Sequence, residues 1–165
     1  GETIRATTSF LMADSTTPDG DYIKPQTNPT NTDCWNGKAY TPLNQLTPGR
    51  TKYGTNNNVR IFRYADVLLM NAEAKIKNGK SGDAPFNEVR RRAQMPELTN
   101  VTFEQVIDER RMELVCEWGE RYNDLVRTGL AKTELKGWSE DKALLPLPFN
   151  QYTQIPDLLK EPKDE

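Results

Sequence analysis

The sequence predicts a mainly helical protein with an irregular, loop-rich N-terminal segment. Residues 59–130 carry nearly all of the long apolar runs, and these recur at the three- and four-residue spacing of helices. Residues 1–58 are instead rich in Thr, Asn and Pro and have no such period. We therefore expect residues 1–58 to form a loop-rich cover that contacts ligand, and residues 59–165 to form a helical scaffold.

Composition and charge exclude several classes of partner and chemistry. The net charge of the 165 residues is −2 with both signs interspersed, so we expect no nucleic-acid partner and no direct membrane contact. No stretch approaches the roughly 18 to 20 apolar residues that cross a bilayer. The sequence contains no His, the usual general base and metal ligand. We expect no catalytic residue, no metal and no cofactor.

The two cysteines, Cys34 and Cys116, have no metal-ligand spacing and allow a single disulfide. An inert buried thiol is the commoner fate of a cysteine in a helix. We expect free thiols, and a Cys34–Cys116 bridge is the alternative.

The first predicted helix follows the Asn56-Asn57-Asn58 run, which can supply an N-cap, and it ends at Asn78-Gly79. At 100° per residue its apolar side chains form two opposed faces. One face holds Ala65, Leu68, Leu69, Ala72 and Ile76, and the other holds Val67, Met70 and Ala74. Such a helix packs between two neighbours, as in tetratricopeptide-like helical hairpins. The central helix of a compact bundle is the alternative.

Three more helices are predicted after this one. The second covers about residues 83–93, the third about 102–118, and a short fourth about 121–127. The third has the clearest start, because Thr102 and Gln105 fit a capping box. Two hairpins are too few to close a solenoid core, which usually needs about three repeats. We therefore expect this chain to be part of a larger protein, with an exposed apolar patch that favours self-association.

Charged side chains gather on the third and fourth predicted helices. Arg110 lies among apolar residues and needs a carboxylate partner, because an unpaired buried charge is very costly. Glu113 and Glu117 repel each other at i, i+4 spacing unless a cation such as Arg63 comes between them. We expect structural ion pairs in this set: Arg63, Arg110, Glu113, Glu117, Arg121 and Asp124. An acid pair for glycoside hydrolysis is the alternative, which the position of these glutamates in one row on one helix disfavours.

Four aromatic residues of the N-terminal segment are candidate ligand contacts. Trp35, Tyr40, Tyr22 and Tyr53 lie in polar sequence without apolar periodicity, so no helical core requires them. A flat ring can stack on the apolar face of a pyranose, and polar neighbours can hydrogen-bond the sugar hydroxyls. The alternative for each ring is that it folds the loop back onto the helices.

Four motifs occur in a fixed order along the helical part. They are RYADVLLM at residues 63–70, NEVRRRA at 87–93, the spaced ER, EL and DL pairs of 109–125, and LLPLP at 144–148. Together they resemble the C-terminal part of the SusD/RagB family over about residues 59–160. These are scaffold motifs, so the resemblance assigns no glycan-contacting residue.

The resemblance implies a function and a location. Members of this family are non-catalytic glycan-binding lipoproteins on the surface of Bacteroidetes-type bacteria, where tetratricopeptide-like helices support a variable, loop-rich part. They cover a SusC-like TonB-dependent transporter at the outer membrane. By this resemblance the chain is expected to bind an oligosaccharide or polysaccharide during glycan uptake, in a protein whose lipid anchor is absent from this chain.

Two other functions stay open at this point. In the first, these residues are a scaffold or protein-interaction region that docks on the transporter, and the glycan site lies upstream. In the second, which the residues disfavour, the chain is a carboxylate-based glycoside-acting enzyme.

Overall fold

In the computed structural model the chain forms two compact units, residues 1–124 and 125–165. The boundary expected between residues 58 and 59 therefore falls inside the first unit. The structure describes residues 3–25, 33–49, 55, 58–118, 120–144 and 148–154. Tyr53 and most of the LLPLP motif lie outside the described residues.

The N-terminal part of the first unit contains more regular structure than the sequence predicts. Its elements are α1 (Thr3–Ser9), β1 (Phe10–Met12), β2 (Ser15–Thr16), β3 (Tyr22–Ile23), β4 (Cys34–Asn36), η1 (Gly37–Ala39) and η2 (Leu43–Gln45). Antiparallel ladders join β1 to β4 and β2 to β3. The loop-rich character expected of this segment is confirmed, but its short strands were not predicted, because strands of two or three residues are too short to show an alternating pattern.

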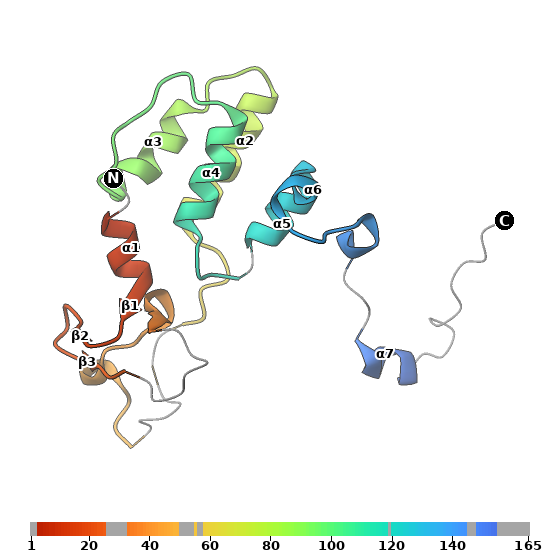
Figure 1. Ribbon diagram of the computed structural model, residues 1–165. Helices are drawn as coiled ribbons and strands as arrows, with labels where there is room; N and C mark the ends of the chain where they lie inside the picture. The colour runs from red at the N-terminus through yellow and green to blue at the C-terminus, as the bar shows by residue number, and fades with distance from the viewer. Residues whose placement is uncertain are drawn as a thin grey trace. The chain divides into compact units, whose positions relative to one another are not determined.

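The rest of the described chain is helical, which confirms the predicted mainly helical class. Its elements are α2 (Tyr64–Lys77), α3 (Asp83–Arg92), α4 (Phe103–Glu113), α5 (Glu120–Thr128), α6 (Ala131–Glu134), η3 (Glu140–Ala143) and α7 (Phe149–Gln154). Helix α2 packs against both α3 and α4 (Figure 1). No helix in the described ranges is long and apolar enough to span a membrane.

The core of the first unit forms where α2, α3 and α4 meet. The first predicted face of α2 lies in it. The buried cluster consists of Ala65, Leu68, Leu69, Ala72, Phe86, Val89, Val101 and Val106. The second predicted face is different, since Val67 is 49% exposed and Met70 is 44% exposed. Among the described residues, α2 is therefore buried on one side only.

The start of α2 differs from the prediction. The helix begins at Tyr64 and not directly after Asn58. Its N-cap residue is Arg63, whose backbone is extended at φ −121° and ψ 154°. The Arg63 guanidinium bonds to the carboxylates of Glu113 and Glu117, and these bonds hold the chain extended up to the helix. The predicted end is confirmed, because Asn78 is the C-cap and the following glycine has φ +68°.

The other helix ends follow from capping and backbone geometry. The capping box of Thr102 and Gln105 at the start of α4 is confirmed. Helix α3 begins at Asp83, whose carboxylate accepts the backbone N–H groups of Asn100 and Val101 and does not cap its own helix. Helix α4 ends at Glu113, earlier than predicted. A left-handed backbone at Cys116, with φ +64°, excludes continuation of the helix.

Candidate functional site

A pocket of about 640 Å³ lies on the β-ladders of the N-terminal part. Three of the four predicted aromatic contacts, Tyr22, Trp35 and Tyr40, line it together. We call it the aromatic pocket, and its other lining residues are Leu11, Ile23, Lys24, Pro25, Asn36 and Ala39. The fourth candidate, Tyr53, lies outside the described residues.

The two ladders position the rings. Trp35 of β4 lies opposite Leu11 of β1, so both side chains emerge on the same face of that ladder. Tyr22 of β3 lies opposite Thr16 of β2. Tyr22 is 53% exposed, which leaves much of its ring accessible to a ligand.

Hydrogen bonds from the tyrosine hydroxyls fix the two tyrosine rings. The Tyr40 hydroxyl donates to Asp21, and the Tyr22 hydroxyl donates to Asp14 Oδ1 at 2.7 Å. Burial and the Asp21 hydrogen bond raise the pKa of Tyr40, and the Asp14 hydrogen bond raises the pKa of Tyr22. The hydroxyls are thus held by the protein, and the ring faces are the parts left to bind a ligand.

The polar residues that flank Trp35 in the sequence mostly bond to the scaffold. Asn36 donates from Nδ2 to the carbonyl of Cys116 at 2.7 Å, and its Oδ1 accepts the Lys38 N–H at 2.9 Å. The Lys38 ammonium donates to Glu117 Oε1 at 2.8 Å. These contacts anchor β4 and η1 to the turn after α4. Cys34 and Cys116 are both free, half-buried thiols.

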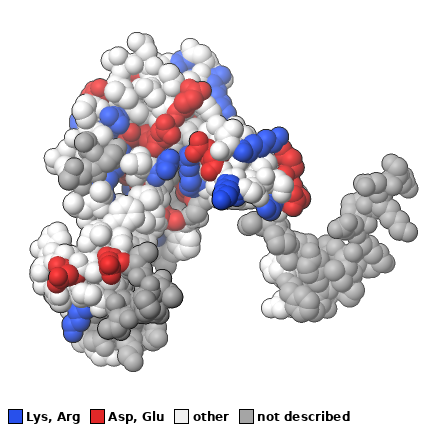
Figure 2. All heavy atoms as spheres, in the orientation of Figure 1, with Lys and Arg blue, Asp and Glu red and all other residues white. Residues whose placement is uncertain are grey.

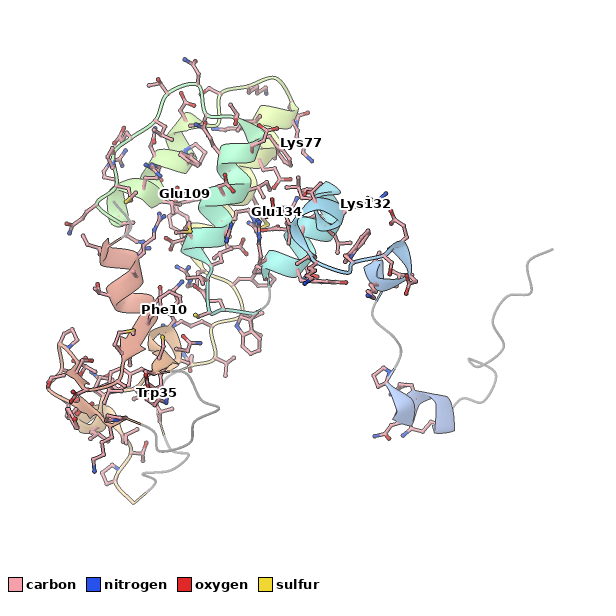
Figure 3. All side chains as sticks on the ribbon, in the orientation of Figure 1. Phe10, Trp35, Lys77, Glu109, Lys132 and Glu134 are labelled. Carbon is pink, nitrogen blue, oxygen red and sulfur yellow. The ribbon has the colours of Figure 1, made fainter. Side chains whose placement is uncertain are left out.

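A cluster of ion pairs lies beside this pocket, around the glutamates of α4 and the turn after it. Glu109 of α4 lies next to α3 (Figure 3) and binds Arg90 at 2.7 Å as well as Arg5 of α1. Glu117 binds Arg63 at 2.7 Å and Lys38 at 2.8 Å. On the face drawn in Figure 2, basic and acidic side chains lie intermixed.

Glu113 is the centre of this cluster. Its side chain is 2% exposed and lies 2.6 Å from Arg92, 3.1 Å from Arg63 and 3.2 Å from Arg5. Burial raises the pKa of Glu117, but hydrogen bonds from Arg63 and Lys38 together lower it by more, so the net shift of the pKa is downward. Cations from several separate segments therefore surround these two carboxylates.

A second buried ion-pair site joins α2, α4 and α5. Arg110 donates to Asp66 at 2.6 Å and to Asp124 at 2.8 Å, and all three side chains are buried. Burial lowers the pKa of Arg110, but Asp124 and Asp66 raise it by more. Arg121, also expected in an ion pair, lies half-buried in α5.

A second pocket of about 640 Å³ adjoins the ion-pair cluster. We call it the ionic pocket, because five basic and two acidic side chains line it: Arg5, Lys38, Arg60, Arg63, Arg92, Glu113 and Glu117. Asn36, Ala39 and Tyr40 line both this pocket and the aromatic pocket. The two pockets are therefore neighbours that share a wall.

A protein-family model matches most of this chain. The model of the SusD family, SusD/RagB, matches residues 5–158. The chain belongs to the SusD family. The resemblance seen in the sequence began near residue 59, so its start was placed too late. Residues from α1 and the β-ladders are part of the match.

Curated relatives of this SusD-family chain are longer than it is. It is 33% identical to the SusD-like protein P38 of Formosa agariphila, covering 61% of this chain and 24% of the relative. It is 36% identical to the starch-binding protein SusD of Bacteroides thetaiotaomicron, covering 48% of this chain and 14% of the relative.

Solved structures share the fold. Surface glycan-binding protein A from Bacteroides uniformis has a TM-score of 0.71 at 28% identity, over 94% of this chain and 37% of the other. Surface glycan-binding protein A from Bacteroides thetaiotaomicron in complex with laminarihexaose has a TM-score of 0.64 at 31% identity, over 81% of this chain and 31% of the other.

Several charged residues of the two ion-pair sites escaped the sequence reasoning. Arg5 is in a Thr-rich segment with no apolar period, and nothing in that segment indicates burial. Asp66 and Arg92 belong to the family motifs, but those motifs do not show which charge meets which. A search for carboxylates on predicted buried faces would have found Asp66, since its α2 neighbours Ala65 and Leu69 are both apolar.

Proposed function

We propose that this SusD-family protein binds an oligosaccharide or polysaccharide in the aromatic pocket without cleaving it. The observation that carries the proposal is the meeting of Tyr22, Trp35 and Tyr40 in one pocket. Three rings from separate segments offer flat apolar faces, and such faces stack on the C–H side of a pyranose. Both tyrosine hydroxyls are held by aspartates, which fixes the rings before a ligand arrives and lowers the entropy cost of binding.

The relatives support a carbohydrate ligand. One similar structure contains laminarihexaose, and a curated relative is named for starch binding. By analogy, the protein would lie on the bacterial cell surface, lipid-anchored at the outer membrane, and would pass its ligand to a SusC-like TonB-dependent transporter. These parts of the proposal rest on family relationship.

The state of the glutamates supports a non-catalytic role. Glycoside hydrolysis needs one carboxylic acid with a raised pKa. Glu113 and Glu117 are each bonded to two or more cations, and the pKa of Glu117 is lowered. If glycans incubated with the protein gained reducing ends, and Glu113→Gln or Glu117→Gln abolished the gain, a catalytic role would replace this proposal.

The test of the binding site is titration calorimetry with a panel of oligosaccharides that begins with laminarihexaose. A central stacking residue typically contributes about 2 kcal/mol or more, so Trp35→Ala is expected to weaken binding by about 30-fold. Tyr22→Ala is expected to weaken it by about tenfold. Tyr64→Ala is the matched control, because Tyr64 is equally an exposed tyrosine but lines neither pocket.

A second function is favoured by the exposed apolar residues around the start of α2. Val59, Ile61, Phe62, Tyr64, Val67 and Met70 are all exposed in the structure. This surface would suit a scaffold that docks on the transporter or on other parts of a longer protein, with the glycan site elsewhere. Unchanged glycan affinity of the intact protein after both Trp35→Ala and Tyr40→Ala would favour this second function.

A further inference from the structure

The ionic pocket has more positive charge than its own carboxylates neutralise. Of the described residues that line it, five are basic and two are acidic. Glu109, the next carboxylate outside the pocket lining, is itself paired with Arg90, so counting this pair leaves the excess of positive charge unchanged. A cavity with an excess of positive charge attracts anions, and its low-dielectric walls strengthen the attraction.

Two of these cations are free to take a further partner. The Arg92 side chain is 61% exposed, and its partner Glu113 is already bonded to Arg5 and Arg63. Arg60 is exposed, and no ion pair joins it to a carboxylate among the described residues. Guanidinium groups bind carboxylate and sulfate oxygens through paired hydrogen bonds, which favours an oxyanion over other anions.

A buried hydroxyl provides a second, independent observation. Ser9 lines the ionic pocket and is 1% exposed, and its Oγ has no hydrogen-bond partner among the described residues. A buried hydroxyl without a partner is costly and rare in folded proteins. An oxyanion in the pocket would accept this hydrogen bond.

The geometry points to an acidic saccharide. We propose that the ionic pocket binds the carboxylate or sulfate group of a glycan whose neighbouring sugar ring lies in the aromatic pocket. The shared wall of Asn36, Ala39 and Tyr40 allows one ligand to contact both pockets. This inference rests on the proposed glycan-binding function and names the class of glycan.

The test compares acidic oligosaccharides with matched neutral forms by titration calorimetry on the intact protein. One pair is an oligogalacturonate hexamer and its methyl ester, and the other is a sulfated galactan oligosaccharide and its desulfated form. At least one acidic form is expected to bind about tenfold or more tightly than its neutral partner, and the pair that discriminates identifies carboxylate or sulfate. The preference is expected to shrink as salt rises, because screening weakens exposed charge interactions.

Variants assign the preference to the pocket. Arg60→Gln and Arg92→Gln are each expected to lower affinity for the acidic form about tenfold and to leave affinity for the neutral form unchanged. Arg91→Gln is the matched control, since Arg91 is an exposed neighbour on α3 that pairs with Glu97 outside the pocket. Ser9→Ala is expected to lower affinity for the acidic form several-fold without loss of thermal stability, because the hydroxyl it removes has no hydrogen-bond partner in the described part of the chain.

Three outcomes would overturn the inference in different ways. Equal binding of acidic and neutral forms that depends on Trp35 would refute the acidic-glycan class and leave the aromatic site standing. An acidic preference that survives both Arg60→Gln and Arg92→Gln would place the anion elsewhere. If no saccharide bound at all, both this inference and the proposed function would fail.

Discussion

Replacing Arg110 with methionine tests whether the buried ion pairs hold the helices together. Arg110 joins α4 to Asp66 of α2 at 2.6 Å and to Asp124 of α5 at 2.8 Å, and all three side chains are buried. The Arg110→Met variant fills a similar volume with an apolar side chain and removes the guanidinium that lies between the two buried carboxylates.

The expected cost is large for a protein of this size. Removing one partner of a buried ion pair typically costs about 3–5 kcal/mol, of a total stability of about 5–15 kcal/mol. At about 2–4 °C per kcal/mol, the melting temperature should fall by roughly 6–20 °C. Circular dichroism melts and urea unfolding measure both quantities.

Two further variants sharpen this experiment. Combining Arg110→Met with Asp66→Asn and Asp124→Asn removes both carboxylate charges, so it should recover a large part of the lost stability. Arg91→Met breaks an exposed pair with Glu97 and should cost no more than about 1 kcal/mol. If Arg110→Met cost as little as Arg91→Met, the reasoning about buried charge would be refuted.

Four other predictions concern the scaffold. Thr102→Ala, which removes the capping box of α4, should cost about 1 kcal/mol in urea unfolding. Leu69→Ala, at a fully buried core position, should cost about 2–5 kcal/mol in the same assay. The pKa of Glu117 is lower in the folded than in the unfolded state. The contribution of Glu117 to the free energy of unfolding should therefore be complete above its unfolded pKa and lost as pH falls through the folded pKa. Glu117→Gln should flatten that acid limb of the stability curve. The exposed Val67 and Met70 should promote self-association, which Val67→Lys with Met70→Lys should reduce in light scattering.

Each of these has a result that would contradict it. An unchanged unfolding midpoint in Thr102→Ala would show that the capping box does not stabilise the fold, and the same result in Leu69→Ala would show this for the core position. An acid limb that is identical in Glu117→Gln would mean that other carboxylates govern the pH dependence. Monomers of the unmodified protein over a wide concentration range would exclude self-association.

The helices were predictable because their signals are local. The capping box at Thr102 and the C-cap at Asn78 each depend on residues within a few positions. The start of α2 was predicted wrongly because its determinant is distant. Arg63 is held extended by Glu113 and Glu117, about one helical hairpin further along the chain.

The candidate site was only partly predictable for the same reason. Polar surroundings without a helical period singled out Tyr22, Trp35 and Tyr40, and the structure places them in one pocket. The ladders that bring them together depend on pairings such as Leu11 with Trp35, which no local pattern encodes. The ionic pocket was not predicted as a pocket, although Arg63, Glu113 and Glu117 of its lining were expected to form ion pairs. Its other charges come from segments that are neighbours only in space.

The contact between Arg5 and Glu109 has a consequence for the order of events during synthesis. The two residues are separated by 104 positions, and Asn36 is separated from its partner Cys116 by 80. A seven-residue helix such as α1 is unstable by itself, so α1 must wait for α4. At about 5–20 residues per second, a ribosome needs roughly 5–20 s to bridge that gap. The ionic pocket, which is lined by Arg5 and Ser9 of α1 and by Glu113 of α4, is therefore completed only after α4 has left the ribosome.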